Sequence, residues 1–154
     1  MRVHKRAYSL VELIVVVLSI GILAAVVAPR LNIAAITKHK AKATARKLVI
    51  DLRRARRLAI SNAAINTAGF KLKMTDPSPY YTGYEIENMD TGETVDSHTI
   101  DSKVFCKADG EFMFGPLGNL LSGSGTQIVL ADAEDNSFTI TIIPTTGMTK
   151  CFEN

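Results

Sequence analysis

The stretch "RAYSLVELIVVVLSIGILAAVVAPRL" (residues 6–31) decides the fold of this chain. From residue 13 to residue 28 only Ser19 and Gly21 interrupt the apolar side chains, and one carboxylate, Glu12, stands directly before them. A charged side chain within hydrocarbon costs several kcal/mol, roughly 2.5 to 3.5 for Asp, Lys or Arg at the centre of an inserted helix. We therefore expect Glu12 either to lie at a membrane surface or to have a partner.

The apolar run has the length of a membrane-spanning helix, because about twenty residues cross a hydrocarbon core of roughly 30 Å. The basic stretch "MRVHKR" (residues 1–6) precedes it. This positive flank predicts a cytoplasmic N-terminus and an exported C-terminus. A secretory signal peptide is the alternative interpretation, since "AAVVA" (residues 24–28) has the small residues of a cleavage site. The helical periodicity that follows favours a continuous helix.

That periodicity consists of apolar residues that recur at alternating spacings of four and three. They are Ala41, Ala45, Leu48, Leu52, Ala55 and Ala59. Together with the apolar run, they predict a rod from about Tyr8 to Ala64, roughly 85 Å long at 1.5 Å per residue. Pro29 is expected to kink it, because proline removes one backbone hydrogen bond. A stripe made mostly of alanine predicts close packing against a sheet.

The net charge of +3 hides a strong separation of charge along the 154 residues. Residues 30–57 contain ten Lys or Arg and one acid, a charge of +9, whereas residues 70–154 contain thirteen acids and five lysines, a charge of −8. Hydrophobic residues make up 47% of the chain, which is typical of a globular rather than a disordered protein. The sequence therefore predicts a basic rod joined to an acidic head.

The head has the pattern of an antiparallel β structure. Short alternating segments are separated by Gly, Pro, Asn and Asp, with turns expected at "MDTG" (89–92) and "DAED" (132–135). The expected strands are residues 69–74, 80–88, 93–100, 103–106, 111–114, 126–131, 136–143 and 147–152.

"A-YSLVE" behind a basic leader and before an apolar helix resembles the class III leader of type IV prepilins and type II secretion pseudopilins. The resemblance implies that prepilin peptidase cleaves between Ala7 and Tyr8 and methylates the new amino group of Tyr8. Ala7 stands where the family usually has Gly. Leu10, Glu12 and Pro29 match the family spacing, and the resemblance assigns Leu10 and Glu12 to subunit assembly.

The rest of the chain resembles the GspH/FimT-type minor pseudopilins. "ARKLVIDLRRARRLAISN" is similar to the end of their long helix, and "EFMFGPLGN" with "TQIVLADAEDNSFTITIIPTTGMTKCF" is similar to their C-terminal strands. The family usually has a tryptophan-glycine pair where this chain has "TGYEI". The implied architecture is an α+β pilin-like fold, with a leader (1–7), a transmembrane and assembly helix (8–28), an amphipathic helix (29–65) and a mainly antiparallel β head (66–154).

The resemblance implies a structural subunit rather than an enzyme, and the residues themselves predict no cofactor and no metal. Such a subunit is anchored once in the bacterial inner membrane, with a periplasmic head, and then enters a periplasmic or extracellular filament that supports protein secretion. The implied partners are other pilin or pseudopilin subunits, prepilin peptidase, the inner-membrane assembly platform and membrane lipid.

In that family the glutamate corresponding to Glu12 faces the N-terminal amine of a neighbouring subunit. A carboxylate–ammonium pair is far stronger in a low-dielectric medium than in water, and breaking a buried pair is costly. The alternative is an interfacial glutamate near a helix N-terminus, where the helix dipole favours it.

The arginine cluster (Arg53, Arg54, Arg56 and Arg57) allows two interpretations. It could bind DNA phosphates, as a FimT-like minor pilin that serves natural transformation would. Charge pairing with neighbouring subunits or with the acidic head is the favoured interpretation. A major pilin subunit, and a membrane enzyme with an exported domain, are further alternatives, but no serine has a nearby base in the pattern.

Two smaller features remain open. Cys106 and Cys151 both fall in the exported head, where an oxidising compartment permits a disulfide, and the alternative is two separate thiols. "DAEDN" (132–136) could coordinate Ca²⁺, but a polar hairpin turn is favoured because the EF-hand spacing is missing. The three histidines His4, His39 and His98 are scattered and predict no metal cluster.

Overall fold

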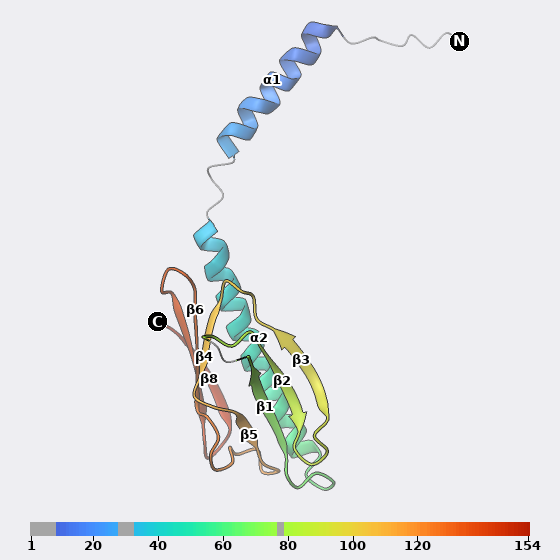
Figure 1. The fold of residues 1–154 in the computed structure, drawn as a ribbon, viewed down its shortest axis with the longest axis vertical. Helices are drawn as coiled ribbons and strands as arrows, with labels where there is room; N and C mark the ends of the chain where they lie inside the picture. The colour runs from blue at the N-terminus through green and yellow to red at the C-terminus, as the bar shows by residue number, and fades with distance from the viewer. Residues whose placement is uncertain (1–8, 28–32, 77–78) are drawn as a thin grey trace, which may run out of the picture. The chain divides into compact units, whose positions relative to one another are not determined.

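The structure is a computed structural model that describes residues 9–27, 33–76 and 79–154 (Figure 1). The chain divides into two compact units, Met1–Ile33 and Ala34–Asn154. Each unit is described by itself below.

The first unit contains helix α1 (Leu10–Val27), whose first turn carries Glu12. The helix begins with a local cap, because the Val11 amide donates to the Ser9 hydroxyl at 3.2 Å. Residues 9–25 are exposed throughout. No helix within the described ranges is both long enough and apolar enough to cross a membrane. The kink expected at Pro29 lies outside the described residues.

The second unit is organised around helix α2 (Ile33–Ser61). The apolar stripe expected from the sequence is confirmed, because each of its residues is at most 1% exposed: Ala41, Ala45, Leu48, Leu52, Ala55 and Ala59. The helix ends at Ser61, three residues before the expected end at Ala64. This face of the helix belongs to the core that α2 shares with the strands.

Two four-stranded sheets pack against this helix, and every strand pair in them is antiparallel. The first sheet has the order β3-β2-β1-β5, with β1 (Phe70–Thr75), β2 (Gly83–Asn88), β3 (Thr94–Thr99) and β5 (Phe112–Phe114). The second has the order β4-β6-β7-β8, with β4 (Phe105–Ala108), β6 (Gln127–Ala131), β7 (Ser137–Ile143) and β8 (Met148–Glu153). Each strand falls on an expected segment, so the α+β class and the antiparallel pairing are confirmed.

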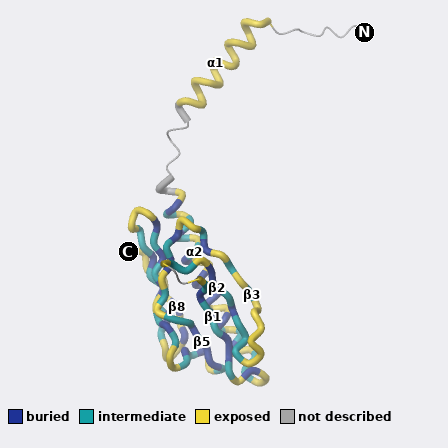
Figure 2. Tube along the Cα trace, viewed as in Figure 1, coloured by how far each residue is buried: buried dark blue, intermediate teal, exposed yellow. Residues whose placement is uncertain are grey.

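The core of this unit joins both sheets to the helix. Phe112 and Phe114 of β5 are fully buried, as are Leu72 of β1 and Ile140 of β7. Strand burial alternates, for example in β7, where every second residue is buried, and this is the period-two pattern from which the strand was predicted. Figure 2 shows buried residues along α2 and the strands beside it.

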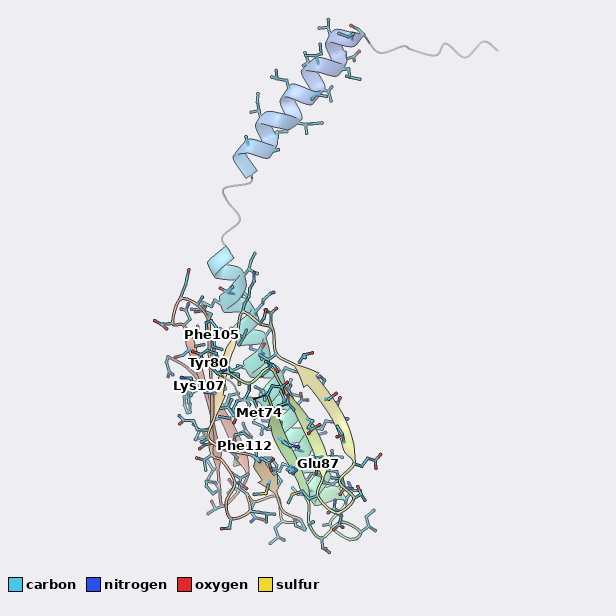
Figure 3. The ribbon with its side chains drawn as sticks, viewed as in Figure 1. Met74, Tyr80, Glu87, Phe105, Lys107 and Phe112 are labelled. Atoms are coloured by element: carbon cyan, nitrogen blue, oxygen red, sulfur yellow. The ribbon has the colours of Figure 1, made fainter. Side chains whose placement is uncertain are left out.

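A small aromatic cluster lies outside this core, on the second sheet. The rings of Tyr80 and Phe105 have centroids 4.9 Å apart, and the ammonium group of Lys107 lies 5.4 Å from the Tyr80 ring centroid (Figure 3). Such a cation–π contact at an exposed site is worth about 0.5–1 kcal/mol. The cluster ties the segment before β2 to β4.

Candidate functional site

Helix α1 presents the first candidate site. Its large apolar side chains are exposed on every side, for example Leu10 at 75%, Val17 at 61% and Leu23 at 65%. Glu12 makes no ion pair or hydrogen bond through its side chain with any residue that the structure describes. Ala7 and Tyr8, the expected cleavage and methylation site, lie outside the described residues.

The four clustered arginines of α2 do not share one role. Arg54 forms an ion pair with Asp96 of β3. Arg53 donates from Nη2 to the backbone oxygen of Thr149 at 3.3 Å, and Arg56 donates from Nε to the backbone oxygen of Gly118 at 2.9 Å. Arg57 makes no hydrogen bond or ion pair within the described part of the chain.

Three of these residues, Arg53, Arg56 and Arg57, line a pocket of about 330 Å³, which we call the arginine pocket. Ile60 and Met148 add apolar walls, and Gly147 and Thr149 add backbone from the turn before β8 and from β8 itself. No carboxylate lines the pocket and its three arginines make no ion pair with described residues, so their positive charge is uncompensated.

The remaining cations of α2 are largely paired with acids of the head. Lys38 and Lys42 both contact Glu153, at 3.1 and 2.9 Å, and Lys40 contacts Asp101 at 2.7 Å. These lysines pair with the acidic head, whereas within the arginine cluster, for which such pairing was the favoured interpretation, Arg54 is the one residue paired with an acid among the described residues. Exposed pairs of this kind contribute about 0–1 kcal/mol each.

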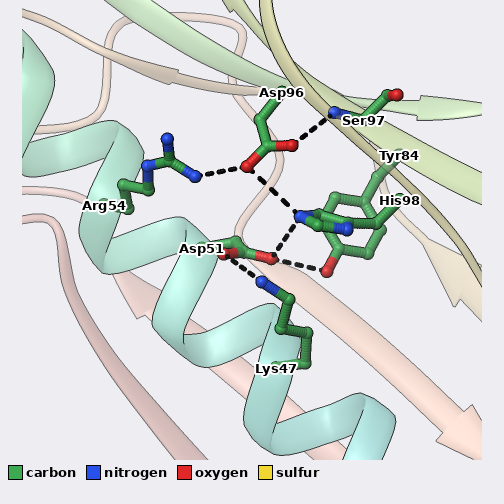
Figure 4. Close-up of polar contacts among 7 residues, drawn as sticks. All are labelled: Lys47, Asp51, Arg54, Tyr84, Asp96, Ser97 and His98. Atoms are coloured by element: carbon green, nitrogen blue, oxygen red, sulfur yellow. Dashed lines mark hydrogen bonds and ion pairs between the residues drawn. The ribbon is translucent and has the colours of Figure 1, made fainter.

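A buried polar cluster joins α2 to the first sheet (Figure 4). Asp51 is 1% exposed and accepts a 2.7 Å hydrogen bond from the Tyr84 hydroxyl. The ammonium group of Lys47 lies 3.2 Å from Oδ1 of Asp51. Nε2 of His98 lies 3.6 Å from Asp51 and 3.4 Å from Asp96. Sequence reasoning did not single out this cluster.

The signal for it was present in the sequence, because Asp51 is the single acid of the basic segment 30–57 and precedes Leu52 of the buried stripe. Burial, followed by the hydrogen bond to Asp51, raises the pKa of Tyr84 far above its usual value. The tyrosine is therefore held as a neutral donor. The cluster compensates a buried carboxylate and connects α2 to β2 and β3.

The two cysteines are free thiols, so the disulfide between Cys106 and Cys151 does not form. Cys106 lies in β4 and Cys151 in β8, which are the opposite edges of the second sheet. Three strand spacings separate them, about 14 Å, whereas a disulfide requires Cα atoms within about 7 Å. Burial raises the pKa of Cys106 to about 12.

Residues 132–136 form the polar hairpin turn between β6 and β7, as favoured from the sequence. Oδ1 of Asp132 accepts hydrogen bonds from the amides of Glu134 and Asn136, at 2.9 and 3.0 Å, and Oδ2 accepts one from the Asn136 side chain at 2.9 Å. Both carboxylate oxygens of Asp132 therefore accept hydrogen bonds from residues within the turn. Glu134 and Asp135 are exposed.

No protein-family model, no curated protein and no solved structure matches this chain. Function is therefore inferred from the residues of α1, of α2 and of the head.

Proposed function

We propose that the chain is a structural subunit of the pilin class, a minor pilin or pseudopilin, with a pilin-like fold. The observation that carries this proposal is the exposure of α1, whose apolar side chains surround the helix and whose single acid, Glu12, stands in its first turn. Soluble monomers rarely expose continuous apolar surfaces of this size, and such surfaces mark membrane or protein contacts. Lipid and the α1 helices of neighbouring subunits are the proposed occupants.

The proposed span is residues 8–28, with the head outside the bacterial inner membrane. The apolar surface of α1 would first lie in lipid and then against other subunits in a filament that supports protein secretion. Glu12 would then pair with the methylated amine of Tyr8 in a neighbouring subunit. In a low-dielectric surrounding this pair favours one axial register, because misplacement leaves two charges uncompensated.

The head supports a structural role. Helix α2 is buried along its alanine stripe and is tied to both sheets by Arg54, Lys40 and Lys42. A head packed in this way moves as one body with α2, which suits a subunit whose helix carries the assembly contacts.

A DNA-binding subunit for natural transformation is the second candidate, favoured by the uncompensated charge of the arginine pocket. A protein with several phosphate contacts loses roughly 10³–10⁵ in affinity between about 50 and 200 mM salt. Titration of the full chain with labelled duplex and single strands at both salts tests it. Tight binding at the higher salt, abolished by Arg53→Ala with Arg57→Ala, would make DNA uptake the leading function.

The first experiment on the main proposal is the intact mass of the chain isolated from membranes of a bacterium with active prepilin peptidase. We expect a mature protein that begins at Tyr8 with a methylated amine and that fractionates with the inner membrane. A peptidase-deficient strain is the control and should retain residues 1–7. A mature N-terminus at Arg30 would overturn the proposal.

The second experiment compares Glu12→Ala with Ser19→Ala, a control on the same helix. Both variants should be inserted and cleaved, because neither touches the residues at the cleavage site. We expect only Glu12→Ala to be depleted from sheared filaments, since it removes the proposed ion pair. Equal incorporation of both variants would contradict the role of Glu12.

A further inference from the structure

The arginine pocket differs in its charge balance from most of the other cations of α2, of which Arg46 alone has no carboxylate partner among the described residues. Lys38, Lys40, Lys42, Lys47 and Arg54 each face a carboxylate. The three pocket arginines have no carboxylate partner among the described residues, because Arg53 and Arg56 donate only to neutral backbone oxygens. Those hydrogen bonds orient the guanidinium groups without neutralising them. The pocket is therefore arranged to receive an anion.

Two glycines hold Arg56 in this position. Gly118 and Gly147 have positive φ angles of 77° and 63°, a conformation that favours glycine. A Cβ atom at either position would lie 3.1 Å from Nε of Arg56, and one at Gly147 would lie 2.0 Å from the carbonyl oxygen of Gly118. Backbone from two separate turns thus encloses one side of the guanidinium group.

The rim of the pocket indicates a protein ligand. Ile60 and Met148, which line the pocket, are 43% and 54% exposed. Arginine and methionine are enriched at protein interfaces, where apolar side chains surround the contact. Interfaces with DNA are more polar and more uniformly positive. An acidic peptide segment with apolar neighbours fits this surface better than a phosphate backbone.

The chain carries a complementary segment at the other end of the same unit. The turn 132–136 precedes β7 and the pocket residue Gly147 follows it, so they lie at opposite ends of a strand of about 23 Å at 3.3 Å per residue (Figure 1). At the tip of the turn, Glu134 and Asp135 are exposed and form no ion pair with described residues. They are adjacent unpaired carboxylates.

We propose that the arginine pocket binds the 132–136 turn of a second copy of this chain. Glu134 and Asp135 of one copy would face Arg53 and Arg57 of the next. The pocket and the turn are different surfaces at opposite ends of the unit, so the contact is heterologous and continues from copy to copy in a line rather than closing a dimer. The inference deepens the proposed function and rests on it, because a filament places successive subunits in a line.

Cysteine cross-linking of the full chain in membranes tests this contact. In a Cys151→Ser background, the variant with Arg57→Cys and Asp135→Cys should give disulfide-linked dimers and longer ladders under mild oxidation. The matched control pairs Arg57→Cys with Glu93→Cys, another exposed carboxylate position outside the turn. We expect at least about tenfold less dimer in the control, because residue 93 lies outside the turn and the proposed contact does not bring it within the roughly 7 Å that a disulfide with residue 57 requires. No ladder, or equal ladders in both variants, would overturn the inference.

A second experiment exchanges the two charges between the pocket and the turn. Recovery in the double variant would show that the single variants had lost the contact and not the fold. Arg57→Glu alone and Asp135→Arg alone should each weaken chemical cross-linking of the full chain, and the double variant should restore it. Failure of the double variant to restore cross-linking, with an unchanged thermal midpoint, would also overturn the contact. A chain that is processed at Tyr8 and enters filaments without this contact would refute the inference and leave the proposed function standing.

Discussion

The hydroxyl group of Tyr84 donates a 2.7 Å hydrogen bond to Oδ2 of Asp51, and this bond connects β2 to the buried side of α2. The other carboxylate oxygen faces Lys47. A buried carboxylate without partners would cost several kcal/mol, so the tyrosine and the lysine together allow an acid beside the alanine stripe. The packing of the helix on the first sheet therefore depends on one polar contact as well as on apolar burial.

Tyr84→Phe is expected to lower the free energy of unfolding by about 1–3 kcal/mol, because it leaves a buried acceptor without its donor. Urea denaturation of the full chain in detergent measures the change. Tyr81→Phe is the matched control, because the Tyr81 hydroxyl makes no hydrogen bond with described residues. Equal stability of the two variants would contradict the role assigned to Tyr84.

Alkaline pH should destabilise the wild-type head through the same residue. The pKa of Tyr84 is raised in the folded protein, so the unfolded chain loses this proton near pH 10 while the folded chain keeps it. Stability from this group is therefore complete below about pH 10 and falls as the pH rises further. Denaturation midpoints measured across this range should fall less steeply for Tyr84→Phe. An identical pH dependence would refute the interpretation.

Acidic pH should loosen the turn 132–136. Burial alone would raise the pKa of Asp132, but hydrogen bonds from the Asn136 side chain and from the amides of Glu134 and Asn136 outweigh it and lower the pKa. Stability from Asp132 is therefore present above about pH 4 and is lost as the pH falls through the lowered folded pKa. Asp132→Asn should reduce this acid dependence, whereas Asp135→Asn, at an exposed position, should not. Hydrogen exchange at residues 132–136 provides the measurement.

The alanine stripe should tolerate no larger side chain. Ala45→Leu is expected to cost about 1–3 kcal/mol, because Ala45 is 1% exposed and the added atoms would force the helix and sheet apart. Ala43→Leu, two residues away on the exposed side of the same helix, should change stability by less than about 0.5 kcal/mol. Thermal denaturation followed by circular dichroism separates the two, and similar costs would show that close packing is not what the stripe provides.

The thiols should differ in reactivity. Cys151 is exposed, whereas Cys106 is buried and its pKa is raised to about 12, so little thiolate exists at neutral pH. A maleimide reagent should label one thiol in the native protein and two after unfolding, and Cys151→Ser should remove the native reaction. Two unreactive thiols in unfolded, unreduced protein would instead reveal a disulfide.

The spacing of apolar and turn residues along the sequence determined many of the helices and strands of the second unit. The spacing of Ala41, Leu48 and Ala55 defines one face of a helix, and that face is buried as expected. Alternation in "NSFTITII" (136–143) and the turn residues before it define β7 and its hairpin. These features depend on residues a few positions apart, which is the range over which backbone geometry and side-chain period are set by the sequence.

Only the tertiary structure decided which distant residues meet. Asp51 contacts Tyr84 and His98, and four neighbouring arginines separate into an ion pair with Asp96 and a pocket beside Gly147. Cys106 and Cys151 were compatible with a disulfide in the sequence, and the strand order β4-β6-β7-β8 places them at opposite edges of a sheet. The physical reason is that strand order and helix docking minimise the exposed apolar surface of the whole unit, so the partners of polar groups follow from the packing and not from any local spacing.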